Sequence, residues 1–244
     1  MGHRLYGIFQ IAVGWGLTLL ACAVMIVANL VLLGQGYRHL NPWFLRNWGR
    51  TMLWLSRIKL QVDHGERLWT PEPAIVTLNH ASLLDLFIFT SVMPPRSVSI
   101  AKKEMLNFPM VGLAMRAFRY IFVDRENPQK ARASMAKAAK RMTRQRLKVF
   151  IAPEGTRSRS DALGPFKMGA FHLALATRVS IIPVVVHGAR DLHPYGRWTS
   201  RPGAVRVVVH PPLSTDHYTD ENLRDEAAAL RRFYLEELGM TEET

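Results

Sequence analysis

Short apolar runs alternate with longer segments of helical periodicity from residue 58 onward. The runs that predict strands are 58–63, 74–78, 97–101, 120–124, 148–152, 180–186 and 204–209. Helices are predicted to begin near Ser82 and at Pro109, and to cover 127–146, about 167–177, and 220–238. A chain with this alternation is typical of the α/β class, and we expect a mixed central sheet flanked by helices.

The N-terminal segment differs, because residues 5–37 contain no Lys, Arg, Asp or Glu. Its apolar core, residues 8–33, exceeds the roughly 20 helical residues that cross a bilayer. A secretory signal would have an apolar region of only about 7–15 residues before a small-residue cleavage site. We therefore expect a retained membrane-associated helical segment, which either crosses the bilayer or enters it as a shallow hairpin.

Residues 41–57 mix aromatic residues with arginines, a pattern typical of a helix at the membrane interface. An ordinary amphipathic core helix is the alternative. We expect residues 1–57 to form membrane-anchoring helices and residues 58–244 to form the α/β domain. Basic residues follow the apolar segment more often than they precede it: Arg4 comes before, and Arg38, Arg46, Arg50 and Arg57 come after. This bias predicts attachment to the inner (cytoplasmic) membrane, with the α/β domain on the cytoplasmic side.

The net charge is +13, from 32 Lys and Arg against 19 Asp and Glu, and such an excess suits a polyanionic partner. An anionic membrane surface, an acidic carrier protein and nucleic acid all fit that charge. No zinc-finger, recognition-helix or RNA-binding sheet motif stands out, so nucleic-acid binding is disfavoured. The single cysteine, Cys22, excludes an internal disulfide, and its apolar surroundings are poor for a catalytic thiolate.

Residues 130–148 contain eight basic residues and no acidic one. At helical spacing, one stripe would hold Lys137, Lys140, Arg141, Arg144 and Lys148. A solvated helix face is one interpretation of this stripe. Contact with anionic headgroups, with the phosphates of CoA or with an acidic carrier is the other.

The stretch NHASLLD, residues 79–85, places a polar pair directly after a buried strand. Asp85 could simply cap a helix that starts near Ser82. On one helix the side chains of His80 and Asp85 would be about 140° apart, but a loop histidine and a first-turn aspartate can meet. A carboxylate on one ring nitrogen fixes the tautomer and leaves the other nitrogen as a base. The pair therefore suggests a general base, with a plain helix cap as the alternative.

Another predicted strand runs into PEGTRS, residues 153–158. Gly155 allows the backbone to approach a ligand closely, and Thr156 offers a hydroxyl. Arg157 and Arg159 offer guanidinium forks that match phosphate oxygens. The GxxxxGK[ST] sequence of nucleotide-binding P-loops is absent, and a solvated basic turn is the alternative interpretation.

Two weaker signals accompany these motifs. Arg125 directly follows the strand predicted at 120–124. Pro183 interrupts the strand predicted at 180–186, which marks an edge, a bulge or a pocket wall.

Four blocks occur together in this order: NHASLLD, FVDR, PEGTRS followed by FKMGAF, and IIPV. In this combination the chain resembles the glycerolipid acyltransferase family, which includes the bacterial 1-acyl-sn-glycerol-3-phosphate (lysophosphatidate) acyltransferases. The resemblance covers residues 58–212. The family often has a glycine shortly before the second block, where this chain has Arg119 and Tyr120. The resemblance therefore specifies the reaction more closely than the headgroup of the acceptor.

The resemblance implies transfer of a fatty acyl group from acyl-CoA or acyl carrier protein to the sn-2 hydroxyl of 1-acyl-sn-glycerol-3-phosphate, giving phosphatidic acid. Alternative acceptors are a lyso-ornithine lipid, another lysophospholipid or glycerol-3-phosphate, and the non-enzyme alternative is a basic membrane-binding protein. By similarity, His80 is the general base and Asp85 its orienting partner. The implied phosphate site consists of Arg125, Glu154, Gly155, Thr156 and Arg157, and Pro183 would line the acyl or thioester side.

Elementary chemistry agrees with these roles. The acceptor alcohol must lose a proton as it attacks the thioester, and a free imidazole, with a pKa near 6.5, is mostly neutral at pH 7 and can take that proton. A GxSxG elbow and a second cysteine, either of which would suggest an acyl-enzyme, are absent from the sequence. We expect no cofactor and no metal, and we expect backbone amides to stabilise the oxyanion.

Overall fold

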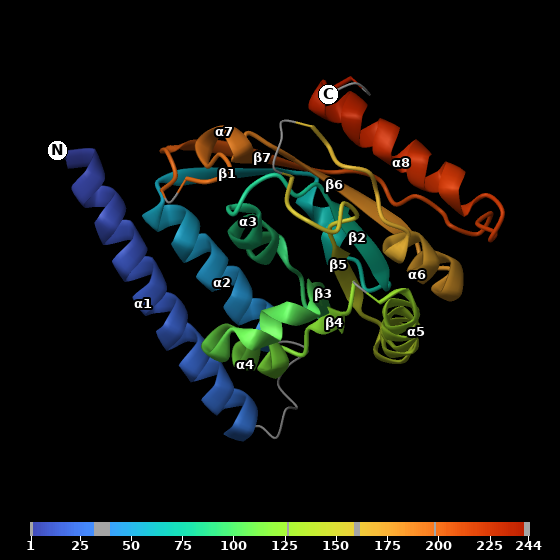
Figure 1. Ribbon diagram of the computed structural model, residues 1–244, viewed down its shortest axis with the longest axis horizontal. Helices are drawn as coiled ribbons and strands as arrows, with labels where there is room; N and C mark the ends of the chain where they lie inside the picture. Colours follow the sequence, from blue (N-terminus) through green and yellow to red (C-terminus); the bar gives the residue numbers. More distant parts are fainter. Residues whose placement is uncertain (1, 32–39, 126, 159–161, 198, 242–244) are drawn as a thin grey trace.

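The computed structural model describes residues 2–31, 40–125, 127–158, 162–197 and 199–241. Within them, a seven-stranded sheet has the order β1-β7-β6-β2-β5-β3-β4 (Figure 1). Its strands are β1 (Ile58–Asp63), β2 (Ala74–Leu78), β3 (Ser97–Lys102), β4 (Ile121–Val123), β5 (Lys148–Ile151), β6 (Ile181–His187) and β7 (Gly203–Val209). β6 and β7 pair antiparallel, and the other neighbouring strands pair parallel. The predicted mixed α/β sheet is therefore confirmed.

Helices cover both faces of this sheet (Figure 1). One face carries α5 (Pro128–Gln145), α6 (Gly169–Thr177) and α8 (Leu223–Leu238), and the other carries α2 (Leu40–Leu55), α3 (Asp85–Val92) and α4 (Pro109–Ala117). The short elements are η2 (Gly65–Trp69), η3 (Lys103–Asn107) and α7 (Ala189–Leu192). Successive side chains of β2 point to opposite faces of the sheet. Ile75 packs in the buried cluster that contains Tyr234, whereas Val76 packs in the cluster that contains Leu53 and Ile88.

The long helix α1 (Gly2–Val31) packs against α2 and α4, on the side of the molecule opposite α8 (Figure 1). Cys22 and Met25 join the core, and Thr18 accepts a hydrogen bond from the Trp48 indole at 3.2 Å. Apolar side chains remain exposed along α1 at Leu19, Leu20, Val24, Val27, Leu30 and Val31.

None of the helices in the described residues is long and apolar enough to span a bilayer. Residues 32–39, where the predicted apolar segment ends, lie outside the described residues. The predicted division of the chain at residue 57 stays a prediction.

Local sequence signals place several element ends. α5 begins at Pro128, and the Asn127 side chain caps it by accepting the Lys130 N–H at 3.0 Å. α4 begins at Pro109, as expected. α3 begins at Asp85 rather than near Ser82, because the residues before Asp85 form a turn around its carboxylate.

Pro183 lies in β6, between β7 and β2, so the interpretation of an edge strand is wrong. The bulge interpretation fits better. The β6–β7 ladder stops at Val184 and Val209, and pairing resumes at a bridge between Ile181 and Leu213. In this gap the Pro183 carbonyl accepts the His210 N–H at 2.9 Å. A proline is tolerated here because the regular ladder on this side of β6 is already interrupted.

The basic stripe predicted from residues 130–148 is smaller than expected. Lys148 is buried in β5, where its ammonium group donates to the carbonyl oxygens of Thr70 and Glu72, and burial lowers its pKa. Arg141 is half-buried. The members of the stripe that remain exposed on α5 are Lys137, Lys140 and Arg144.

The close packing of α2 on α3 depends on Gly49. A Cβ atom there would lie 2.3 Å from Thr90 Oγ1 and 2.6 Å from the Phe87 carbonyl oxygen. Gly49→Ala should therefore lower the free energy of unfolding by about 1–3 kcal/mol, measured by thermal or denaturant unfolding in detergent. Gly16→Ala in α1 is the matched control, since nothing lies within 4 Å of its Cβ position. Equal stability of the two variants would contradict this account of the helix contact.

Candidate active site

His80 lies on the loop after β2, and Asp85 opens α3 behind it. The Asp85 Oδ2 atom accepts hydrogen bonds from His80 Nδ1 at 2.9 Å and from the backbone N–H groups of Ala81 and Ser82 at 2.8 Å each. The Asp85 side chain is 1% exposed and the His80 side chain 29% exposed. One carboxylate thus both organises the turn before α3 and orients the imidazole, and the role of the pair as a general base stays a prediction. With Nδ1 engaged, Nε2 is the nitrogen left for chemistry.

The backbone of His80 is held by the neighbouring loop after β5. Its N–H donates to Glu154 Oε1 at 2.6 Å, and its carbonyl accepts the Ser158 N–H at 3.0 Å. Asn79, the residue before His80, ties the loop after β2 to β6, because its side-chain amide makes two hydrogen bonds with the backbone of Val186. The strands β2, β5 and β6 are adjacent and parallel, so these loops leave the sheet at one edge.

Glu154 is buried, and its second oxygen accepts the Gly164 N–H at 3.4 Å. Burial raises the pKa of Glu154 to about 7, although the hydrogen bond from the His80 N–H opposes the shift. These contacts make Glu154 a brace for the His80 loop. Its implied place in the phosphate site stays a prediction, and an inward-facing carboxylate gives that role no support.

The residues that follow Glu154 in the PEGTRS block are more accessible. Gly155 has φ 77°, a conformation that favours glycine, and a Cβ there would lie 3.2 Å from the Lys167 side chain. Thr156 is exposed. The guanidinium of Arg157 stacks over the Tyr195 ring, 4.8 Å from its centroid. Arg159 lies outside the described residues.

Arg125 is exposed after β4, at the same edge of the sheet as His80. The two strand ends are three positions apart in the sheet, roughly 14 Å at the usual strand spacing. Pro183 lies beside Thr77 in the β2–β6 ladder, and Thr77 bonds Tyr234 of α8. The side chain of Pro183 therefore lies on the α8 face of the sheet, and its predicted contact with the acyl group stays a prediction.

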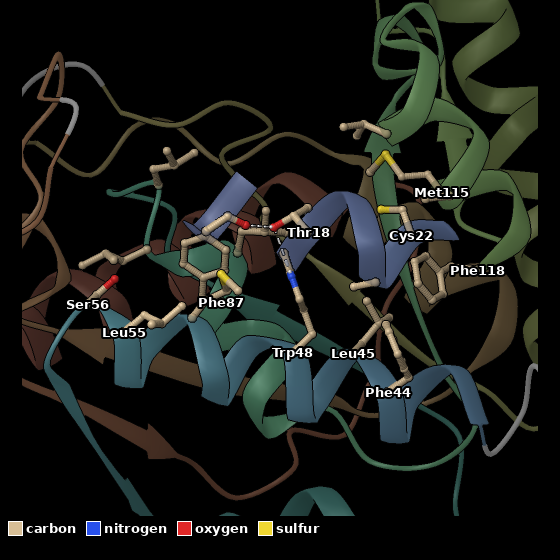
Figure 2. Close-up of a pocket in the computed structure, with 18 of the residues that line it drawn as sticks. Thr18, Cys22, Phe44, Leu45, Trp48, Leu55, Ser56, Phe87, Met115 and Phe118 are labelled. Atoms are coloured by element: carbon tan, nitrogen blue, oxygen red, sulfur yellow. Dashed lines mark hydrogen bonds between the residues drawn. The ribbon is translucent and has the colours of Figure 1, made fainter. Parts of the chain in front are cut away.

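An apolar cavity of about 410 Å³ lies on the other face, between α1, α2, α3 and α4. Figure 2 shows Phe44, Leu45 and Trp48 of α2 facing Thr18 and Cys22 of α1 across it. Leu83 and Leu84, from the turn between His80 and Asp85, line the same cavity, and so does His193. The cavity therefore extends to the turn that carries the histidine–aspartate pair.

A family profile described as Acyltransferase matches residues 59–187. This chain belongs to the acyltransferase family. A 1-acyl-sn-glycerol-3-phosphate acyltransferase from Limnanthes douglasii is 32% identical to it over 227 residues, covering 93% of this chain and 77% of the plant protein. A bacterial enzyme of the same name, from Haemophilus influenzae, is 33% identical over 220 residues, covering 87% of this chain and 88% of that protein.

A solved structure is similar in fold. The 1-acyl-sn-glycerophosphate acyltransferase PlsC from Thermotoga maritima superimposes with a TM-score of 0.72 at 21% identity, covering 97% of this chain and 98% of the other. At that identity the likeness concerns the fold alone.

Several site residues of this acyltransferase escaped the sequence analysis. Tyr195 and His193 lie in the segment after α7, and no motif marks them. Asn79 stood next to His80 in the quoted block, but nothing in the sequence indicated its bonds to β6. Among the described residues, no group of three or more His, Cys, Asp or Glu side chains is arranged to hold a metal ion.

The buried Glu154 makes the stability of this acyltransferase depend on pH. Its pKa rises from 4.5 to about 7 on folding, so folding favours the protonated form. The cost of ionisation is absent below about pH 4.5 and grows until the pH passes about 7, where it reaches roughly 3 kcal/mol. Glu154→Gln cannot ionise. Its stability relative to the wild type should therefore increase across this pH window, as measured by unfolding at pH 4.5–8 in detergent.

Glu236→Gln is the control for this experiment, because Glu236 is an exposed glutamate of α8. It should follow the wild type at every pH. A constant difference between Glu154→Gln and the wild type from pH 4.5 to 8 would contradict the burial argument.

Proposed function

We propose that this acyltransferase moves a fatty acyl group from acyl-CoA or acyl carrier protein to the sn-2 hydroxyl of 1-acyl-sn-glycerol-3-phosphate, giving phosphatidic acid. The relatives that cover most of the chain carry the name of this activity. The observation that carries the mechanism is the His80–Asp85 hydrogen bond at the end of an apolar cavity. Acylation of an alcohol needs a base and a dry place for the acyl chain, and this arrangement supplies both.

The proton moves through His80. Nδ1–H donates to Asp85, so the lone pair on Nε2 accepts the proton of the sn-2 hydroxyl as its oxygen attacks the thioester carbonyl carbon. The tetrahedral intermediate then collapses and the carbon–sulfur bond breaks. The imidazolium gives its proton to the departing thiolate, which returns His80 to the neutral form. The buried Asp85 carboxylate stabilises the imidazolium between these steps.

The apolar cavity is the proposed site of an acyl chain. Its lining comes mainly from four helices and is mostly apolar, as at Leu45, Phe87 and Phe118 (Figure 2). A chain in this cavity would bring its carbonyl end to the turn that holds His80. Apolar walls around the thioester also exclude water, which would otherwise hydrolyse it.

The acceptor phosphate is proposed to bind at Arg157, with Thr156 and Arg125 contributing from the same edge of the sheet. Support comes from the position of Arg157. It lies in the loop after β5, which is hydrogen-bonded to the His80 backbone, and its guanidinium is stacked on the Tyr195 ring. Stacking occupies a face of the guanidinium and leaves its in-plane N–H fork for phosphate oxygens.

We propose that the N-terminal helices hold the enzyme on the cytoplasmic face of the inner membrane, lying in the surface of the bilayer. The exposed apolar side chains of α1 and the exposed Trp43 and Trp54 of α2 support this placement. Arg46 lies over the ring of the exposed Trp69 of η2, 4.9 Å from its centroid, an aromatic–basic pair suited to lipid headgroups.

Removal of the base tests the mechanism. His80→Ala should lower turnover by at least about 100-fold in purified enzyme that still folds and binds membranes, because the sn-2 hydroxyl keeps its proton. Asp85→Asn should also be severely impaired, since the imidazole loses its charged partner. Turnover is measured as labelled phosphatidic acid formed from labelled acyl-CoA and 1-acyl-sn-glycerol-3-phosphate. Near-normal turnover of His80→Ala would refute the assignment.

The same assay, run on membranes with a panel of lysolipids and glycerol-3-phosphate, tests the acceptor. The proposal expects the labelled product to be phosphatidic acid. A labelled product from a different lysolipid alone would replace this acceptor, and no labelled lipid at all would favour a binding protein.

The phosphate assignment predicts how Arg157 and Tyr195 behave. Arg157→Lys keeps the charge but loses the planar fork, so the KM for the acceptor should rise by about tenfold, with a smaller effect on kcat. Tyr195→Leu should raise the same KM because the guanidinium loses its platform, whereas Tyr195→Phe keeps the ring and should resemble wild type. If these variants raise only the KM of the acyl donor, the site binds the other substrate.

A further inference from the structure

Asp85 has an oxygen atom that the mechanism above does not use. Oδ2 accepts three hydrogen bonds, but Oδ1 is buried and has no hydrogen-bond partner among the described residues. Buried carboxylate oxygens are normally satisfied, so an orphan at the catalytic pair calls for a donor.

His193 also has a buried polar atom without a hydrogen-bond partner within the described residues. This residue follows α7, is 6% exposed, and its Nδ1 atom is buried without a partner in the described part of the chain. Burial lowers its pKa, the Arg157 guanidinium lowers it further, and Asp85 opposes the shift. These effects favour the neutral imidazole, which has one N–H to donate and one lone pair.

Ser82 brings the two residues together. Its N–H donates to Asp85 Oδ2 at 2.8 Å, and its hydroxyl donates to the His193 carbonyl oxygen at 2.9 Å. The backbone of His193 is thus fastened to the same turn that surrounds Asp85. Asp85 is also one of the charged groups whose field acts on the His193 imidazole.

We propose that His193 is a positioning residue whose Nδ1–H donates to Asp85 Oδ1, either directly after a small ring rotation or through one buried water. The catalytic carboxylate is then held between two histidines, with His80 on Oδ2 and His193 on Oδ1. This inference rests on the proposed function only for its effect on rate, because the hydrogen bond itself is a property of the free enzyme.

The second donor has a consequence for the base. A hydrogen bond to Oδ1 disperses the negative charge of Asp85, which weakens its stabilisation of the His80 imidazolium. His193 therefore limits how strongly Asp85 holds the imidazolium form and keeps the carboxylate in place beside His80. Among the described residues, the charged or titratable groups near this pair include Glu154, which bonds the His80 backbone, and Arg157.

The position of His193 also connects the base to the substrate. His193 lines the apolar cavity together with Leu83 and Leu84. An acyl chain that fills the cavity excludes water from the same ring, and the hydrogen bond to Asp85 becomes stronger in drier surroundings.

Two substitutions separate the hydrogen bond from packing. His193→Asn places an amide N–H near the position of Nδ1–H, whereas His193→Phe keeps a ring and removes both nitrogens. We expect His193→Phe to lose at least about tenfold in kcat with acceptor KM within about twofold of wild type. The acid limb of its pH–rate profile should move to higher pH. His193→Asn should retain most of the wild-type kcat and pH profile.

The ring NMR signals of His80, titrated in detergent without substrate, give a second readout. The pKa of His80 should be higher in His193→Phe than in wild type and near wild type in His193→Asn. This measurement stands even if the wild type fails to acylate lysophosphatidate, so failure of the proposed function is distinguishable from failure of this inference. A His80 titration that is unchanged in His193→Phe, or shifted equally in both variants, would overturn it.

Discussion

The carboxylate of Asp85 organises the loop that carries His80, the proposed base. Its Oδ2 atom accepts hydrogen bonds from the imidazole of His80 and from two backbone N–H groups. The turn and the orientation of the imidazole are therefore set by the same atom. Burial makes this arrangement strong, because a carboxylate removed from water must be satisfied by the groups around it. The side chain that closes the turn therefore also orients the His80 imidazole.

The loops after β2 and β5 operate as one unit. Glu154 accepts the His80 N–H and Ser158 donates to the His80 carbonyl, so the base cannot shift without the loop that carries Arg157. α8 reinforces this unit, since Arg231 donates to the carbonyl oxygens of Leu163 and Gly164 in the same loop. Adjacent parallel strands make this possible because their carboxyl ends leave the sheet side by side. His80 and Arg157, the proposed base and the proposed phosphate ligand, are thus mechanically coupled through hydrogen bonds to the His80 backbone.

Periodicity and turn signals in the sequence were sufficient to predict the strands, the mixed α/β class and the starts of α4 and α5, because these features depend on local propensity. The NHASLLD block also predicted that His80 and Asp85 meet, since five residues across a loop–helix junction restrict where the two side chains can be. The interpretations of Pro183 as an edge residue and of Lys148 as a surface residue failed. Both depend on which strand lies next to which, and the order β7-β6-β2-β5 is a property of the whole sheet.

The sequence by itself determined the class of fold, the pairing of His80 with Asp85, and the apolar character of the N-terminal helix, because each depends on the order of residues along a short segment. Only the tertiary structure decided that Glu154 faces inward, that Tyr195 lies under Arg157, and that His193 stands beside the Asp85 turn. The cavity between α1, α2, α3 and α4 was likewise decided only by the tertiary structure. These features join residues far apart in the chain, and their positions follow from burial and hydrogen bonding across the sheet, which no local pattern records.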